Sequence, residues 1–133
     1  MEKTKKLNDL FTLFTDNKTI TLAKDQTITK TKNGAYLFSY NTPISTIQDG
    51  VLYLNANIIN IYNTIKQENT TGKAWKISPT TAKYLYKFIN MYLNTLTSAR
   101  VKDEIETHGA NRKTIEKLIK DGLIIEISNK LEV

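Results

Sequence analysis

The sequence predicts an α+β domain, in which an antiparallel β-meander follows an N-terminal helix and precedes a helical C-terminal part. Three observations support this prediction. Residues 19–54 consist of short alternating runs separated by turn residues such as Asn-Gly and Asp-Gly, a pattern typical of β-hairpins. An apolar stripe at helical spacing occupies residues 79–96, and a second helical pattern follows in residues 99–120. With 133 residues the chain can form one domain with its own core.

The first predicted element is a short amphipathic helix that ends near Asp16 and Asn17. Its apolar residues recur three and four positions apart, as on one face of a helix. They are Leu7, Leu10, Phe11, Leu13 and Phe14. A helix this short needs tertiary packing to be stable, so we expect its stripe to lie on the sheet.

Five antiparallel strands are expected over residues 19–23, 26–32, 35–40, 44–48 and 51–54. The predicted turns are Lys24-Asp25, Asn33-Gly34, Asn41-Thr42-Pro43 and Asp49-Gly50. Because side chains alternate along a strand, we expect Ile28 to face the core. Its threonine neighbours Thr27, Thr29 and Thr31 are then expected to face water.

An aromatic row in the third predicted strand, Tyr36, Phe38 and Tyr40, shares one face of that strand. Such a row is either core packing, with cross-strand contacts, or a platform on which bases stack. No RNP-like or OB-type motif surrounds it, so we expect packing.

The central helix is predicted over residues 79–96. Ser78 or Thr80 caps its first turn, and Pro79 suits that turn. Its apolar stripe consists of Tyr84, Leu85, Phe88, Ile89, Tyr92, Leu93 and Leu96. Residues 75–77 are expected to form a strand leading into this helix. Residues 55–66 fit a helix and a strand equally well, and residues 67–72 are a polar loop.

After residue 97 the pattern changes to helix, turn, helix and strand, over residues 99–107, 112–120 and 123–127. We expect residues 1–97 to form the α+β domain and residues 98–133 to form an extension packed on it. Residues 114–124 (TIEKLIKDGLI) resemble the recognition helix and first wing strand of winged-helix proteins. That resemblance covers roughly residues 96–128 and implies that the outward residues of the second helix face a groove in DNA. These residues are Arg112, Lys113, Glu116, Lys117 and Lys120.

A second resemblance rests on residues 40–44 (YNTPI) and residues 75–85 (WKISPTTAKYL). These stretches resemble a small uncharacterised domain common in phages of low-GC Gram-positive bacteria, with the patterns S-Y-x-T-x-I and W-x-x-S-x-T-T-x-K. It covers about residues 19–96, with residues 56–73 as an insertion, and implies an origin in a mobile element but no known activity. Its motif places Ser78, Thr80, Thr81 and Lys83 at the head of the central helix. Those side chains are either caps or, with exposed N–H groups, an anion site.

Catalytic chemistry is not indicated by the residue types present. The chain lacks cysteine, so thiolate chemistry, disulfides and cysteine-bound zinc are excluded. His108 is the single histidine, no phosphate-binding glycine loop is present, and Asp103, Glu104 and Glu106 are expected to be solvated. We therefore expect no enzymatic activity, no cofactor and no metal. We see no signal peptide or transmembrane run, and expect a cytoplasmic location without membrane contact.

The positive charge is concentrated in one part of the chain. The net charge is +6, and residues 73–102 contain six cations and no acidic residue. Lysine far outnumbers arginine, which is typical of an AT-rich genome and weakens the functional meaning of the charge. The candidate residues for binding nucleic acid or a partner are Lys73, Lys76, Lys83, Lys87, Arg100, Lys102, Arg112, Lys113, Lys117 and Lys120.

Two functions follow as expectations. In the first, the chain is a non-enzymatic phage-type binding protein that acts on nucleic acid through its basic helical region. In the second, it is a protein–protein inhibitor of a host defence nuclease, similar to anti-CRISPR proteins. The expected partner is accordingly nucleic acid or a host protein that handles nucleic acid.

Overall fold

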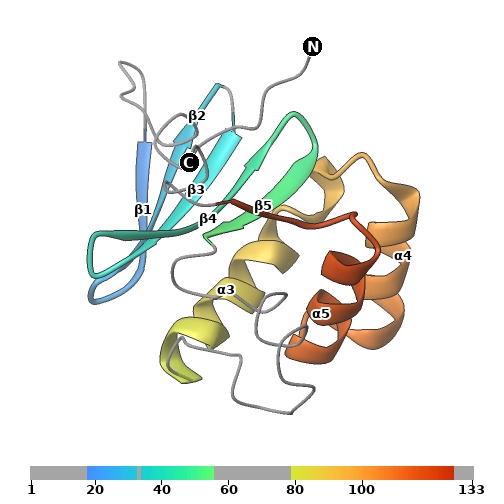
Figure 1. The fold of residues 1–133 in the computed structure, drawn as a ribbon. Helices are drawn as coiled ribbons and strands as arrows, with labels where there is room; N and C mark the ends of the chain where they lie inside the picture. Colours follow the sequence, from blue (N-terminus) through green and yellow to red (C-terminus); the bar gives the residue numbers. More distant parts are fainter. Residues whose placement is uncertain (1–17, 33, 56–78, 128–133) are drawn as a thin grey trace, which may run out of the picture.

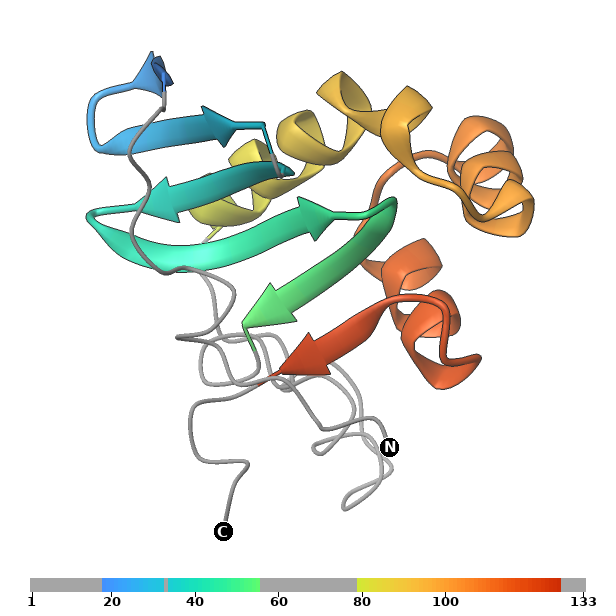
Figure 2. The same ribbon diagram turned by 90° about the horizontal axis from the view of Figure 1, so that it is seen from above.

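A computed structural model describes residues 18–32, 34–55 and 79–127 of the chain. These residues form a six-stranded sheet in the order β1-β2-β3-β4-β5-β6 together with three α-helices. Figure 1 shows the helices grouped on one side of the sheet, and Figure 2 shows α3 running across that side. The predicted α+β class is confirmed. The predicted N-terminal helix, the strand at residues 75–77, most of the ambiguous segment 55–66 and the last residues of the predicted extension, 128–133, lie outside the described residues.

The first five strands form the expected antiparallel meander. Each strand pairs with the next along the chain, so every connection is a hairpin. Their bounds are β1 (Lys18–Ala23), β2 (Gln26–Thr31), β3 (Gly34–Ser39), β4 (Thr42–Gln48) and β5 (Val51–Asn55).

Two of the four predicted turns lie where the sequence placed them, at Lys24-Asp25 and Asp49-Gly50. Asp49 and Gly50 both have positive φ, 52° and 80°, as a two-residue turn that matches strand twist requires. The expectation that Gly34 lies at a hairpin tip was wrong, because Gly34 already pairs with Thr31 in the ladder. A Cβ on Gly34 would lie 2.1 Å from the carbonyl oxygen of Ile47, so close backbone approach is what requires glycine there.

The turn after β3 is Tyr40-Asn41, one residue earlier than predicted. Both residues have positive φ, 52° and 67°. Pro43 was expected in this turn but lies inside β4 opposite Phe38, next to a register shift between Leu37 and Phe38. A proline is tolerated in a strand at such an irregularity, where a ladder hydrogen bond is already missing.

The side of the sheet that faces the helices carries the main core, as the burial of Ile28, Leu37 and Leu54 shows. The opposite side is also buried at its centre, where Tyr36 is 1% exposed and Thr46 is fully buried. The expectation that the β2 threonines face water was therefore wrong. Thr31 is buried and bonded to Gly34, and Thr27 and Thr29 are half-buried.

Helix α3 (Pro79–Met91) is shorter than the predicted helix over residues 79–96. It gives way to a 3₁₀ turn, η1 (Leu93–Thr95), and the Thr95 hydroxyl donates to the Tyr92 carbonyl at 2.7 Å. The stripe is buried at its centre, at Leu85, Phe88 and Ile89, and again at Leu96. Tyr92 and Leu93 are only partly buried and pack against the edge of the core cluster.

Helices α4 (Ala99–His108) and α5 (Arg112–Lys120) agree with the predicted helix–turn–helix, and side chains cap both N-termini. Ser98 accepts from the Val101 N–H and Asn111 from the Thr114 N–H. Strand β6 (Ile125–Ile127) then runs parallel to β5, with Glu126 opposite Leu54. Core residues of the predicted extension and of the meander lie in one cluster; from the extension these are Val101, Ile105, Ile115, Leu118, Ile119 and Ile124.

Candidate binding surface

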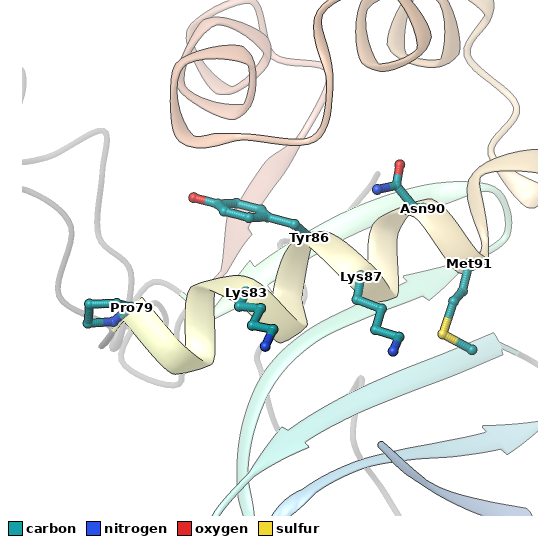
Figure 3. Close-up of a pocket in the computed structure, with 6 residues that line it drawn as sticks. All are labelled: Pro79, Lys83, Tyr86, Lys87, Asn90 and Met91. Atoms are coloured by element: carbon teal, nitrogen blue, oxygen red, sulfur yellow. The ribbon is translucent and has the colours of Figure 1, made fainter. Parts of the chain in front are cut away.

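The exposed face of α3 forms a shallow, nearly flat hollow that is lined by residues of this helix alone. Lys83 and Lys87 lie on it one helical turn apart, and both are exposed. Figure 3 shows that Lys83, Lys87 and Met91 point to one side of α3, while Tyr86 and Asn90 point to the other. The residues that line the hollow are Pro79, Lys83, Tyr86, Lys87, Asn90 and Met91.

The two lysines have no acidic partner within the described part of the chain. Helix α3 itself contains no acidic residue. The Lys83 ammonium lies 5.5 Å from the centroid of the Tyr84 ring, which places it over an aromatic face. An anionic ligand would therefore meet both charges without displacing a carboxylate.

The surface that lines the hollow is mostly apolar. Met91 is 45% exposed, one of the largest exposures of an apolar side chain in the described residues. Tyr86 lies between α3 and the start of α5, and its burial raises the pKa of its hydroxyl. The charge and backbone of Arg112 lower that pKa and Glu116 raises it, but burial has the largest effect.

The predicted cations of α4 and α5 differ from those of α3, because three of them are paired. Arg112 binds Glu116 at 2.8 Å, Lys117 binds Glu104 at 3.2 Å, and Arg100 contacts both Glu104 and Asp121. Arg112 and Glu116 are half-buried, so they are not the outward residues expected from the winged-helix resemblance. The remaining predicted cations are half-buried Lys102 and exposed Lys113 and Lys120.

Glu104 is the centre of a charge cluster that the sequence reading missed. Its side chain is only 17% exposed, and besides Lys117 and Arg100 it lies 3.9 Å from the His108 ring nitrogen. The four-residue spacing of Arg100, Glu104 and His108 is the signal that would have indicated two of these contacts. The contact with Lys117 joins two helices and has no signal in the local sequence.

At the head of α3, the side chains named for a cap or an anion site do not all face solvent. The Thr81 hydroxyl turns inward and lies 3.2 Å from the Ser39 hydroxyl, and Thr81 is 7% exposed. Thr80 is exposed, whereas Ser78, Lys73 and Lys76 lie outside the described residues. Across the described ranges, no group of three or more potential metal ligands comes together.

The strand that follows α5 bears on the winged-helix resemblance. In a winged-helix protein the strand after the recognition helix pairs with a further strand to form a β-ribbon beside that helix. Here β6 instead pairs in parallel with β5 and is the last strand of the main sheet within the described residues. The helix–turn–helix is thus present, while within residues 79–127 no ribbon follows it.

Fold and surface together define a small α+β domain that presents a cationic helix face with an apolar hollow. The chain belongs to a family described as a family of unknown function (DUF8033), whose match extends over residues 9–107. The match includes residues 40–44 and 75–85, on which the resemblance to an uncharacterised domain rests. No curated protein and no solved structure matches the chain. Among the described helices, none is long and apolar enough to cross a membrane.

Proposed function

We propose that the protein is a non-enzymatic, phage-type binding protein that acts on nucleic acid through α3, in the cytoplasm of a bacterial host. The observation that carries this proposal is the pair Lys83 and Lys87. Both are exposed, adjacent on one helix face, and without an acidic partner among the described residues. Neighbouring phosphates are the ligands for which such a pair is suited.

Helix α3 is a better candidate than α5 for the primary contact. A phosphate that approached Arg112 or Lys117 would compete with Glu116 or Glu104 for the same cation. Lys113 and Lys120 are exposed and are proposed as supporting phosphate contacts. Lys73 and Lys76 are also proposed as phosphate contacts, because they precede α3 in the sequence.

The test is a charge reversal on α3, Lys83→Glu combined with Lys87→Glu. Binding of labelled DNA is measured by fluorescence anisotropy between 50 and about 300 mM salt. Each phosphate contact contributes about 0.9 to the slope of log K against log salt for duplex, and about 0.7 for single strands. We expect weaker binding to every sequence and a slope that is smaller by about 1.4–1.8.

A matched control carries the same change of charge at a different place. Lys30 and Lys32 lie at the β2–β3 hairpin and are exposed, so Lys30→Glu with Lys32→Glu alters the net charge equally. This control should keep most of the salt slope. If both double variants weaken binding to the same extent, general charge rather than α3 is responsible and the proposal fails.

A second candidate function is inhibition of a host defence nuclease, in the manner of anti-CRISPR proteins. The apolar wall of the hollow favours it, because exposed Met91 beside Lys83 and Lys87 suits an acidic protein surface with an apolar anchor. Its test is cleavage by a purified RNA-guided nuclease from a low-GC Gram-positive host. Two results together would favour this function over the first. The protein inhibits cleavage and Met91→Ser abolishes that inhibition, and the protein does not bind DNA at physiological salt.

A further inference from the structure

Tyr40 adopts a backbone conformation that is unusual for an aromatic residue. Its φ is 52°, in the left-handed region, and its side chain is 66% exposed. The other described non-glycine residues with positive φ, Asp25, Asn41 and Asp49, are of the types that tolerate this region. For a residue such as tyrosine the conformation costs about 1–2 kcal/mol. The packing expected for Tyr40 from the sequence is therefore wrong, and neither burial nor backbone preference explains a tyrosine at this position.

Hydrogen bonds hold the Tyr40 turn in place on both sides. The Tyr40 N–H donates to the carbonyl of Asp25 at 2.8 Å, which joins this turn to the β1–β2 turn. The neighbouring Ser39 hydroxyl lies 3.2 Å from that of Thr81 in the first turn of α3. Figures 1 and 2 show both turns at the end of the sheet where α3 begins. The tyrosine is thus presented on a fixed turn next to the start of the cationic helix.

The residues around Tyr40 offer the groups that contact a nucleotide. Lys24 and Asn41 are exposed on the two joined turns, and so is the carboxylate of Asp25. An aromatic ring stacks on a base, an amide both donates to and accepts from base edges, and an ammonium binds phosphate. From Thr81 to Lys87 the helix rises about 9 Å, so a few nucleotides are enough to join this turn to the lysines of α3.

We propose that Tyr40 stacks on an unpaired base of single-stranded nucleic acid whose backbone continues onto Lys83 and Lys87. This inference rests on the proposed function and names its substrate class. A base in a duplex already stacks on both sides, whereas an unpaired base offers an open face to a ring on an exposed turn. Single strands should therefore bind more tightly than duplexes of the same sequence.

The experiment compares Tyr40→Ala, Tyr40→Phe and the wild type for binding to a fluorescein-labelled dT12 strand and to the dT12·dA12 duplex. Loss of one base–aromatic stack costs about 1–3 kcal/mol, so Tyr40→Ala should raise Kd for the strand about 5- to 150-fold. Tyr40→Phe keeps the ring and should stay within about threefold of the wild type. The duplex should bind less tightly than the strand and respond little to either change.

A third variant, Tyr40→Asn, separates a functional role from a structural one. Asparagine tolerates the left-handed region, so this variant should melt at a higher temperature than the wild type while losing affinity for the strand. A lower melting temperature with loss of binding would show that Tyr40 supports the fold, and would overturn the inference.

The failure of this inference differs from the failure of the proposed function. If Tyr40→Ala binds the strand as tightly as the wild type while the Lys83 and Lys87 reversals weaken it, stacking is refuted and nucleic-acid binding stands. If the wild-type protein binds neither the strand nor the duplex at any salt concentration, the proposed function fails and the inference fails with it.

Discussion

Replacing Phe88 with alanine tests whether α3 is anchored to the sheet as the structure shows. Phe88 is fully buried, and its ring lies 5.5 Å from that of Tyr92 at an interplanar angle of 57°. The change removes a large apolar side chain from the core, leaves a cavity, and breaks this tilted aromatic pair. Buried Phe→Ala substitutions cost about 3–5 kcal/mol, and we expect a loss in that range.

Leu93→Ala is the matched control, because it also shortens a side chain in the predicted stripe. Leu93 lies in η1 and is only partly buried. We therefore expect Leu93→Ala to lower the free energy of unfolding by about 1 kcal/mol, about half of the value for a fully buried leucine. For a domain of this size each kcal/mol shifts the melting temperature by about 4 °C. The expected shifts are about 12–20 °C for Phe88→Ala and about 4 °C for Leu93→Ala.

The measurement is equilibrium unfolding in urea, followed by circular dichroism, with thermal melts as a second readout. The dependence on urea should stay the same in both variants, so that midpoints report stability alone. Equal losses for the two variants would refute the distinction between α3 and η1. A loss below about 1 kcal/mol for Phe88→Ala would show that α3 does not pack on the sheet through this residue.

Two further predictions concern turns and pH. Gly34→Ala should lower the urea midpoint of unfolding more than Gly122→Ala. The new Cβ at position 34 would clash with the Ile47 backbone, whereas a Cβ at position 122 would meet no neighbouring atom and would be disfavoured only by the φ of 78°. Equal midpoints would contradict the close approach of β3 and β4. Burial raises the pKa of Tyr86, so its stabilising contribution is present below its ordinary pKa of 10.0 and is lost as pH rises above it. Stability should therefore fall less steeply above pH 10 in Tyr86→Phe than in the wild type, and identical pH profiles would argue against burial of this hydroxyl.

Features that depend on neighbours along the chain were predictable from the sequence. The Asp49-Gly50 turn, the helix start after Asn111 and the burial of Leu85 all follow from local spacing and turn chemistry. The turn after β3 was displaced by one residue because the irregularity beside Pro43 lets proline enter the strand.

Features that depend on distant partners were not predictable. The pairing of β6 with β5 and the contact of Lys117 with Glu104 join segments from different elements. The number of unpaired cations expected from the local sequence was therefore too large, since the acidic partners of Lys117 and Arg100 come partly from other parts of the fold. Of the predicted binding residues, Lys83, Lys87, Lys113 and Lys120 are exposed and have no acidic partner in an ion pair among the described residues, but their role in binding stays a prediction.

The position of β6 has a consequence for synthesis of the chain on the ribosome. The meander is complete once β5 has emerged, yet β5 remains an edge strand with unpaired backbone groups until β6 arrives. The two strands lie roughly 70 residues apart, a delay of roughly 4–14 s at about 5–20 residues per second. During that interval the nascent meander presents an open edge to other chains. Fragments that end before β6 should consequently aggregate more readily than the whole protein.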